Sequence, residues 1–157
     1  SHTVTHQSLT WSLNNVPKNP DIPDVEKDYA TVPCVYATAY LALFVRGNWK
    51  PEEGESVLVH CGSGGVGQAA LHICLARCQA GAEIFTTCSA RKRDFLLREF
   101  GPLGLQSNNV FNSRDGAFED KIRRQTNQQG VHVVLNSLSG ELQRAAATPM
   151  PIHRALT

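Results

Sequence analysis

The chain has 157 residues, enough for one domain with a sizeable core, because chains of about 150 residues bury roughly 68–70% of their unfolded surface. Hydrophobic residues make up 41% of it, charged residues 18%, and the net charge is +1, which excludes binding to nucleic acid or membranes through bulk charge. No apolar run approaches the roughly 18 residues of a membrane span, and the polar first segment lacks the pattern of a signal peptide. We therefore expect a cytoplasmic protein with no membrane and no nucleic-acid partner.

The cysteines predict reduced, buried structural thiols. They are odd in number, lie in apolar segments and form no CxxC pair; they are Cys34, Cys61, Cys74, Cys78 and Cys88. Cys74 and Cys78 are neighbours on a helix, but no nearby histidine or carboxylate would complete a zinc site, so we expect no metal. Reduced thiols agree with a cytosolic location.

In chain order, the first elements are a linker and a helix. Residues 1–29 are rich in proline and asparagine, and Pro17, Pro20 and Pro23 interrupt any regular element there. From Ala30, apolar residues recur at helical spacing as far as Gly47. This pattern predicts a helix that ends at the glycine.

Strands and helices then alternate. Apolar runs predict strands at residues 56–61, 83–88, 108–112 and 131–136, and helical patterns follow at 66–79, 91–100, 117–127 and from 140. This order predicts an α/β fold with a doubly wound, Rossmann-type parallel sheet of about four strands in the order 3-2-1-4. Because a complete fold of this type has about six strands, we expect residues 30–148 to form a truncated Rossmann domain. Residues 149–157 are expected to be an irregular tail.

A glycine loop joins the first predicted strand to its helix. Gly62, Gly64 and Gly67 fit the pattern G-x-G-x-x-G, where they permit a tight turn, close approach to a pyrophosphate, and close packing of helix on strand. The helix N-terminus adds free N–H groups and partial positive charge. Because the pattern follows a strand and opens a helix, it predicts a dinucleotide site, with a plain tight turn as the alternative.

The end of the second strand indicates which dinucleotide binds. Sites for NAD place an Asp or Glu there, about 20 residues after the glycines. This chain has Ser89, Arg91, Lys92 and Arg93 instead, and Asp94 comes only after them. A hydroxyl and cations suit a ribose 2′-phosphate, which predicts NADPH. The alternative is a solvated basic helical turn, although cations oppose the helix dipole at that end.

Several segments, in this order, resemble one family: "TVPCVYATAYLAL", "GESVLVHCGSGGVGQAA", "IFTTCSARKR", "NSRDGAFED" and "GVHVVLNSLSGE". Together they resemble the enoyl reductase domain of animal-type fatty acid synthases and reducing polyketide synthases. That domain belongs to the zinc-independent, quinone-oxidoreductase-like side of the medium-chain dehydrogenase/reductase superfamily. The resemblance covers about residues 30–142. It implies that residues 1–29 are the remnant of a preceding substrate lobe.

The resemblance implies an activity and partners. NADPH would deliver hydride to the β-carbon of an α,β-unsaturated acyl thioester, and a proton would follow at the α-carbon. The thioester would be bound to acyl carrier protein, and neighbouring synthase domains would surround the reductase. Homodimerisation is an expectation from the family alone.

The resemblance also implies a role for each matching position along NADPH. The implied cofactor-binding residues, from the pyrophosphate through the 2′-phosphate and adenosine to the nicotinamide, are Gly62, Ser63, Gly64, Gly65, Val66 and Gly67; Ser89, Lys92 and Arg93; Ser113 and Arg114; and Asn136, Ser137, Leu138 and Thr38. Tyr40 would also approach the nicotinamide and is the candidate catalytic residue.

Purely structural roles remain open for some of these side chains. Tyr40 lies on an apolar helix and could belong to the core, and Arg114 could pair with Asp115 or Glu119. Asn136 follows a strand at the edge where α/β sheets bind ligands, which favours a functional role. We expect the histidines at positions 60 and 72 to be packing or surface residues.

The chain also departs from the family pattern. The family's next strand, which carries a lysine proposed as proton donor, and its substrate lobe have no match here. We therefore expect a cofactor-binding part that is inactive alone. Two other functions remain open: part of a free-standing NADPH:quinone or alkenal reductase, and a non-catalytic NADPH-binding module. An unpaired edge on the fourth strand would also invite association.

Overall fold

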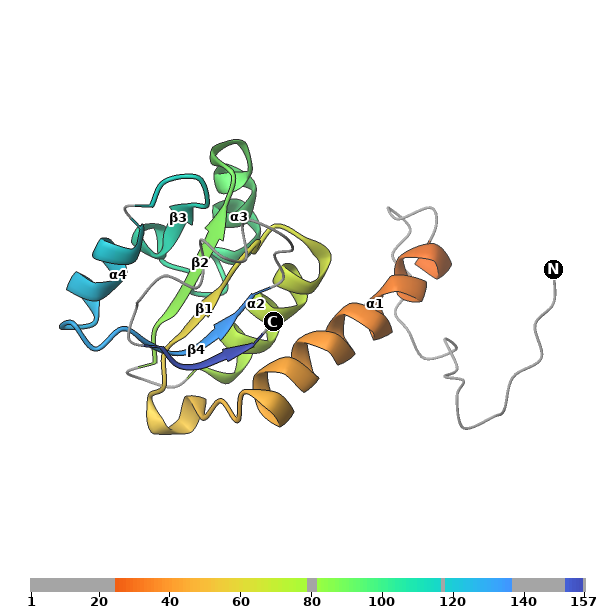
Figure 1. The fold of residues 1–157 in the computed structure, drawn as a ribbon. Helices are drawn as coiled ribbons and strands as arrows, with labels where there is room; N and C mark the ends of the chain where they lie inside the picture. The colour runs from red at the N-terminus through yellow and green to blue at the C-terminus, as the bar shows by residue number, and fades with distance from the viewer. Residues whose placement is uncertain (1–24, 79–81, 117, 137–151, 157) are drawn as a thin grey trace. The chain divides into compact units, whose positions relative to one another are not determined.

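The computed structural model describes residues 25–78, 82–116, 118–136 and 152–156 (Figure 1). By its contacts the chain divides into two units, residues 1–32 and 33–157, and the sheet lies in the second unit. Among the described residues, no helix is both long and apolar enough to cross a membrane.

The described helices and strands alternate along the chain. The helical elements are α1 (Val25–Tyr40), the π-helix η2 (Leu41–Arg46), the 3₁₀ turns η3 (Pro51–Glu53), η4 (Ala90–Lys92) and η5 (Ser107–Asn109), and the α-helices α2 (Gly65–Arg77), α3 (Arg93–Phe100) and α4 (Phe118–Gln125). The strands are β1 (Val57–Val59), β2 (Ile84–Cys88), β3 (Val110–Asn112), β4 (Val131–Leu135) and β5 (Ile152–Leu156).

These strands form one parallel sheet in the order β3-β2-β1-β4-β5. Val59 of β1 pairs with Thr86 of β2 on one side and with Leu135 of β4 on the other. Because all neighbours are parallel, the carboxyl ends of β1, β2, β3 and β4 meet at one edge of the sheet. The predicted fold class and the order 3-2-1-4 are therefore confirmed.

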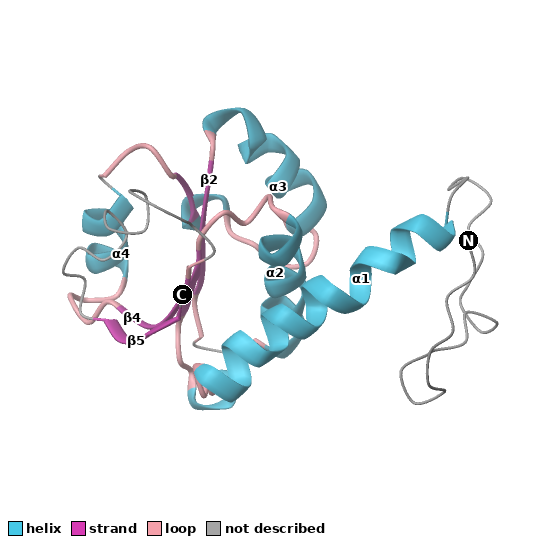
Figure 2. Cartoon of the chain, turned by 45° about the vertical axis from the view of Figure 1, so that its right-hand side comes forward, coloured by secondary structure: helices cyan, strands magenta, loops and turns pink. Residues whose placement is uncertain are grey.

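Helices cover both faces of the sheet, with α2 and α3 on one face and α4 on the other (Figure 2). Successive residues of β1 show why: Val57 and Val59 join the hydrophobic cluster under α2, while Leu58 joins the cluster under α4. Side chains of a strand alternate between faces, so apolar residues at every position bury both faces. All three residues are fully buried.

The boundaries of the first strand and of the first helix differ from the sequence prediction. The strand predicted at 56–61 ends at Val59, because Cys61 takes a left-handed backbone conformation with φ 53° and turns the chain. The first helix begins at Val25, inside the predicted linker, and its last part is a π-helix that ends at Gly47 as predicted. The helix predicted from residue 140 lies outside the described residues.

The prediction of an irregular tail over residues 149–157 is wrong for residues 152–156. They form β5, whose Val131↔Ile152 and Leu135↔Leu156 pairs lie along β4. The sheet thus has a fifth strand where about four were predicted. Backbone N–H and C=O groups on an open strand edge need partners, and β5 supplies them to β4.

Candidate cofactor-binding site

The glycine loop lies between the end of β1 and the start of α2. Its turn is closed by a hydrogen bond of 2.8 Å from the Gly64 N–H to the Cys61 carbonyl. Gly64 is the N-cap of α2, no side chain caps the helix, and no acidic residue lies in its first turn. The first N–H groups of a helix have no partner within the helix, so this end is suited to an anion.

Two glycines of the loop lie where no larger residue would fit. A Cβ on Gly67 would collide with the carbonyl oxygen of Cys61 and would lie 2.8 Å from the Gly62 Cα. A Cβ on Gly62 would collide with Oγ1 of Thr86 on β2. The Gly67 contacts confirm the predicted need for glycine where the helix packs on the strand, whereas at Gly62 the space is limited by Thr86 of β2.

Residues at the ends of β1 and β2 hold the loop in place. The Gly62 N–H donates to the Thr87 carbonyl over 2.9 Å, and the Cys61 N–H donates to Thr87 Oγ1 over 3.4 Å. Nδ1 of His60 lies 3.0 Å from the same hydroxyl oxygen. His60 is buried, burial lowers its pKa to about 4, and Phe118 packs edge-on against its ring. The prediction of a packing histidine is confirmed.

The basic cluster follows β2 directly. Ser89 is half-buried, Lys92 is exposed on η4, and Arg93 opens α3. Burial raises the pKa of the Cys61 thiol, and the positive charge of Lys92 opposes this rise. The positive charge of Lys92 therefore acts on the residue at which the glycine loop begins.

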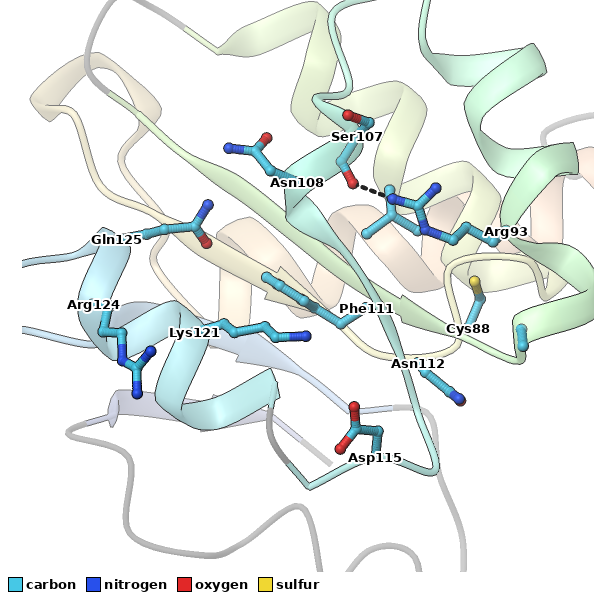
Figure 3. Close-up of a pocket in the computed structure, with 12 residues that line it drawn as sticks. Cys88, Arg93, Ser107, Asn108, Phe111, Asn112, Asp115, Lys121, Arg124 and Gln125 are labelled. Carbon is cyan, nitrogen blue, oxygen red and sulfur yellow. Dashed lines mark hydrogen bonds between the residues drawn. The ribbon is translucent and has the colours of Figure 1, made fainter.

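Arg93 lies by the end of β2, where its positive charge opposes the rise that burial causes in the pKa of the Cys88 thiol. Its guanidinium donates to the Ser107 carbonyl over 2.6 Å, and both residues line a cavity of about 580 Å³ beside β3 (Figure 3). Lys121 of α4 extends into this cavity towards Asn112 (Figure 3). The cavity runs from the end of β2 along β3 and is lined by Cys88, Ala90, Arg93, Ser107, Asn108, Val110, Phe111, Asn112, Asp115, Lys121, Arg124 and Gln125.

The predicted adenosine residues follow β3 at the same edge. The Ser113 N–H donates to the Cys88 carbonyl over 2.8 Å, which continues the pairing of β3 with β2. The Arg114 side chain is exposed, and the backbone N–H of Arg114 donates to Oδ1 of Asn112 over 3.1 Å. Ser113 is thus placed beside the end of β2, where the 2′-phosphate residues begin.

The described residues predicted near the nicotinamide come from two parts of the chain, α1 and the end of β4. Asn136 follows β4 at the carboxyl edge and is half-buried, while Ser137 and Leu138 lie outside the described residues. Thr38 is exposed, and its hydroxyl donates to the Cys34 carbonyl of its own helix over 2.8 Å. Tyr40 is 49% exposed, so the alternative that it belongs to the core is wrong.

The cysteines are all free, but they are not uniformly buried. Cys74 and Cys88 are buried, Cys61 and Cys78 are half-buried, and Cys34 is exposed. The prediction of buried thiols is therefore wrong for Cys34, because it lies on the outer face of α1. His72 is exposed and packs against Phe100 at a ring distance of 4.8 Å, as a surface histidine.

Sequence reasoning missed Thr87 and Lys121. Thr87 lies in the motif "IFTTC", where a threonine in a strand is unremarkable. Only the register between β1 and β2 places it beside the glycine loop. Lys121 belongs to a helix whose polar face looked like an ordinary solvated surface. Both residues could be recognised only from contacts between distant segments of the chain, because neither belongs to a local sequence pattern for this site.

Comparisons with known proteins identify the family, although no protein-family model matches the chain. The highly reducing polyketide synthase anuA of Penicillium roqueforti is 42% identical over 143 residues, which are 90% of this chain. The chain spans only 6% of the length of that synthase.

Solved structures narrow the match. The CurK enoyl reductase is 40% identical with a TM-score of 0.64 and covers 83% of this chain, which spans 36% of that protein. The nucleotide-binding subdomain of the enoylreductase domain of PpsC from Mycobacterium tuberculosis is 32% identical with a TM-score of 0.60, and the match covers 79% of each chain. This chain belongs to the enoyl reductase domains of polyketide synthases, in the medium-chain dehydrogenase/reductase superfamily.

Proposed function

We propose that the chain binds NADPH as the cofactor-binding part of an enoyl reductase, which reduces the double bond of α,β-unsaturated acyl thioesters during polyketide or fatty acid synthesis. The observation that carries this proposal is the glycine loop. Gly67 packs directly on the Cys61 carbonyl, and Gly64 opens α2 with no side-chain cap. These features support a pyrophosphate site, because glycines and an uncapped helix N-terminus leave backbone N–H groups to face the phosphates.

The preference for NADPH over NADH rests on the residues after β2. A hydroxyl and a cation, Ser89 and Lys92, stand where an NAD site carries an acid. The charge of Lys92 acts on the Cys61 thiol, so this cation lies near the loop. Asp94 is exposed in the first turn of α3, after the basic residues, where it does not replace the missing acid.

NADPH would supply hydride when bound, and the residues of this chain would hold and orient it. The loop and the start of α2 would bind the pyrophosphate, and Ser89, Lys92 and Ser113 the adenosine end. Asn136 would lie at the edge where the sheet ends, towards the nicotinamide. The substrate would be an enoyl thioester carried on acyl carrier protein, with neighbouring synthase domains as partners.

The first test is calorimetric titration of the folded chain with NADPH and, in parallel, NADH. Binding is the property to measure first, because the chain spans 36% of the CurK enoyl reductase and its activity alone is a separate question. We expect NADPH to bind at least about tenfold more tightly, a difference of about 1.4 kcal/mol. A chain that is folded by circular dichroism and binds neither nucleotide would contradict the proposal.

A further inference from the structure

Thr87 contacts the glycine loop with both its backbone and its side chain. Its carbonyl accepts the Gly62 N–H over 2.9 Å, and its hydroxyl oxygen accepts the Cys61 N–H over 3.4 Å. The same hydroxyl lies 3.0 Å from Nδ1 of His60. Thr87 is fully buried and His60 almost so. One residue of β2 thus holds three consecutive residues at the end of β1.

The middle residue of these three is the strained one. Cys61 has φ 53°, in the left-handed region that costs a side-chain-bearing residue roughly 1–2 kcal/mol. Such a conformation persists only where the surroundings enforce it. The Cys61 carbonyl in turn accepts the Gly64 N–H and contacts Gly67. The position of this carbonyl therefore sets the path of the loop into α2.

A hydroxyl at position 87 has a consequence that a methyl group would not have. Hydrophobic clusters lie on both faces of the sheet, and a buried hydroxyl is costly there unless it makes hydrogen bonds. Valine has the same shape and would suit a buried strand equally well. Threonine adds the two contacts to His60 and to the Cys61 N–H, both directed at the loop.

We propose that Thr87 is a positioning residue of the cofactor site: with His60 as its partner, it fixes Cys61 in the conformation in which the glycine loop receives the pyrophosphate. The inference rests on the proposed function, since it assumes that the loop binds a dinucleotide. Thr87 itself would not touch the cofactor. Its effect would be confined to the pyrophosphate and would not reach the 2′-phosphate residues after β2.

The test separates these two parts of the site with two probes. NADPH contains the pyrophosphate, whereas adenosine 2′-monophosphate has the 2′-phosphate without it. We expect Thr87→Val to weaken NADPH binding about tenfold, the scale of one buried hydrogen bond. Binding of adenosine 2′-monophosphate, followed by NMR titration, should stay within about twofold of wild type, because a loss of only a few tenths of a kcal/mol is expected away from the altered contact. Thr87→Ser, which keeps the hydroxyl, should restore most of the NADPH affinity.

Thr126→Val is a matched control for loss of stability. Thr126 directly follows α4, and its Oγ1 donates to the Ile122 carbonyl over 2.8 Å and accepts the Gly130 N–H over 2.9 Å. The Thr126→Val variant should lower the free energy of unfolding without changing the affinity for either probe. If Thr87→Val does not fold, Thr87→Cys can be compared with Thr87→Ser, because both lack the γ-methyl group and differ only in thiol against hydroxyl. The thiol is the weaker hydrogen-bonding group, so Thr87→Cys should show the selective loss relative to Thr87→Ser.

The outcomes distinguish this inference from the proposed function. If wild type binds NADPH and Thr87→Val binds it equally well, or loses both probes alike, the positioning role is overturned and the proposed function stands. If the folded wild-type chain does not bind NADPH, the proposed function fails and the inference fails with it.

Discussion

The carbonyl oxygen of Cys61 occupies the space that a side chain on Gly67 would need. The contact lies between the turn that follows β1 and the first turn of α2. A Cβ built on Gly67 would also lie 2.8 Å from the Gly62 Cα. Both neighbours are backbone atoms, which cannot rotate away as a flexible side chain can. The helix and the strand can approach this closely only with glycine at position 67.

Gly67→Ala should therefore destabilise the fold and weaken NADPH binding together. Overpacking of a tight contact costs typically about 1–3 kcal/mol, and the shift would move the N-terminus of α2. Gly116→Ala is the control, because a Cβ there meets nothing within 4 Å. Urea denaturation and calorimetric titration of both variants measure the two effects. Equal stability of the two variants would show that the close contact is not a constraint.

The stability of the chain should depend on pH through His60. Burial lowers its pKa from 6.5 to about 4 in the folded state. Between these values the unfolded chain binds a proton that the folded chain does not, so the free energy of unfolding falls as the pH decreases from 6.5 towards 4. Above about 6.5 this contribution is fully retained. The expected loss between pH 7 and pH 5 is about 2 kcal/mol.

Urea denaturation at both pH values, for wild type and His60→Asn, measures this dependence. The variant cannot take up the proton, so its own loss of stability between the two pH values should be smaller by about the same 2 kcal/mol. Parallel pH dependence in the two proteins would assign the effect to other groups.

The two basic residues after β2 should contribute differently. Lys92 is exposed and acts on the loop, whereas the Arg93 guanidinium is bound to the Ser107 carbonyl over 2.6 Å. Lys92→Ala should thus weaken NADPH binding about tenfold or more, the scale of a hydrogen bond to a charged group, and weaken NADH binding less, because NADH has the pyrophosphate but no 2′-phosphate. Arg93→Ala should also lower stability, because it removes a bond between α3 and η5.

Arg98→Ala is the matched control on α3, since Arg98 is paired with Glu99 at the surface. Calorimetry with both nucleotides and a thermal denaturation scan are sufficient. A larger loss of NADPH selectivity in Arg93→Ala than in Lys92→Ala would reverse the assignment.

Much of the fold could be predicted because its signals are local. Unbroken apolar runs such as "SVLVHC" fixed the type of element and its double-sided burial, and the alternation of elements gave the strand order. β5 was missed because Pro149 and Pro151 precede it and its pairing partner, β4, is distant in sequence. Strand pairing between remote segments leaves little trace in a short run of residues.

The candidate site likewise has features that local sequence predicts and features that depend on distant segments. The glycines were predictable because they form a known local pattern, and at Gly67 the steric demand is set by Cys61 and Gly62 of the same loop. The direction of the Arg93 side chain and the contacts of Thr87 were not, because both depend on neighbouring strands and turns. Lys121 was missed for the same reason: its cavity is formed by β2, β3 and α4 together.

The thiols offer a test of the site that does not depend on an affinity measurement. Cys34 is exposed, Cys61 is half-buried beside the glycine loop, and Cys74 is fully buried. Burial raises the pKa of the Cys61 and Cys74 thiols, which lowers the fraction of reactive thiolate. Iodoacetamide should therefore modify Cys34 first, Cys61 more slowly and Cys74 last, as followed by mass spectrometry of the peptides.

NADPH should slow the modification of Cys61 and leave that of Cys34 unchanged, because only Cys61 adjoins the loop. Protection of Cys34 and Cys61 to the same extent would indicate general stabilisation, and no protection of Cys61 would place the nucleotide away from the loop.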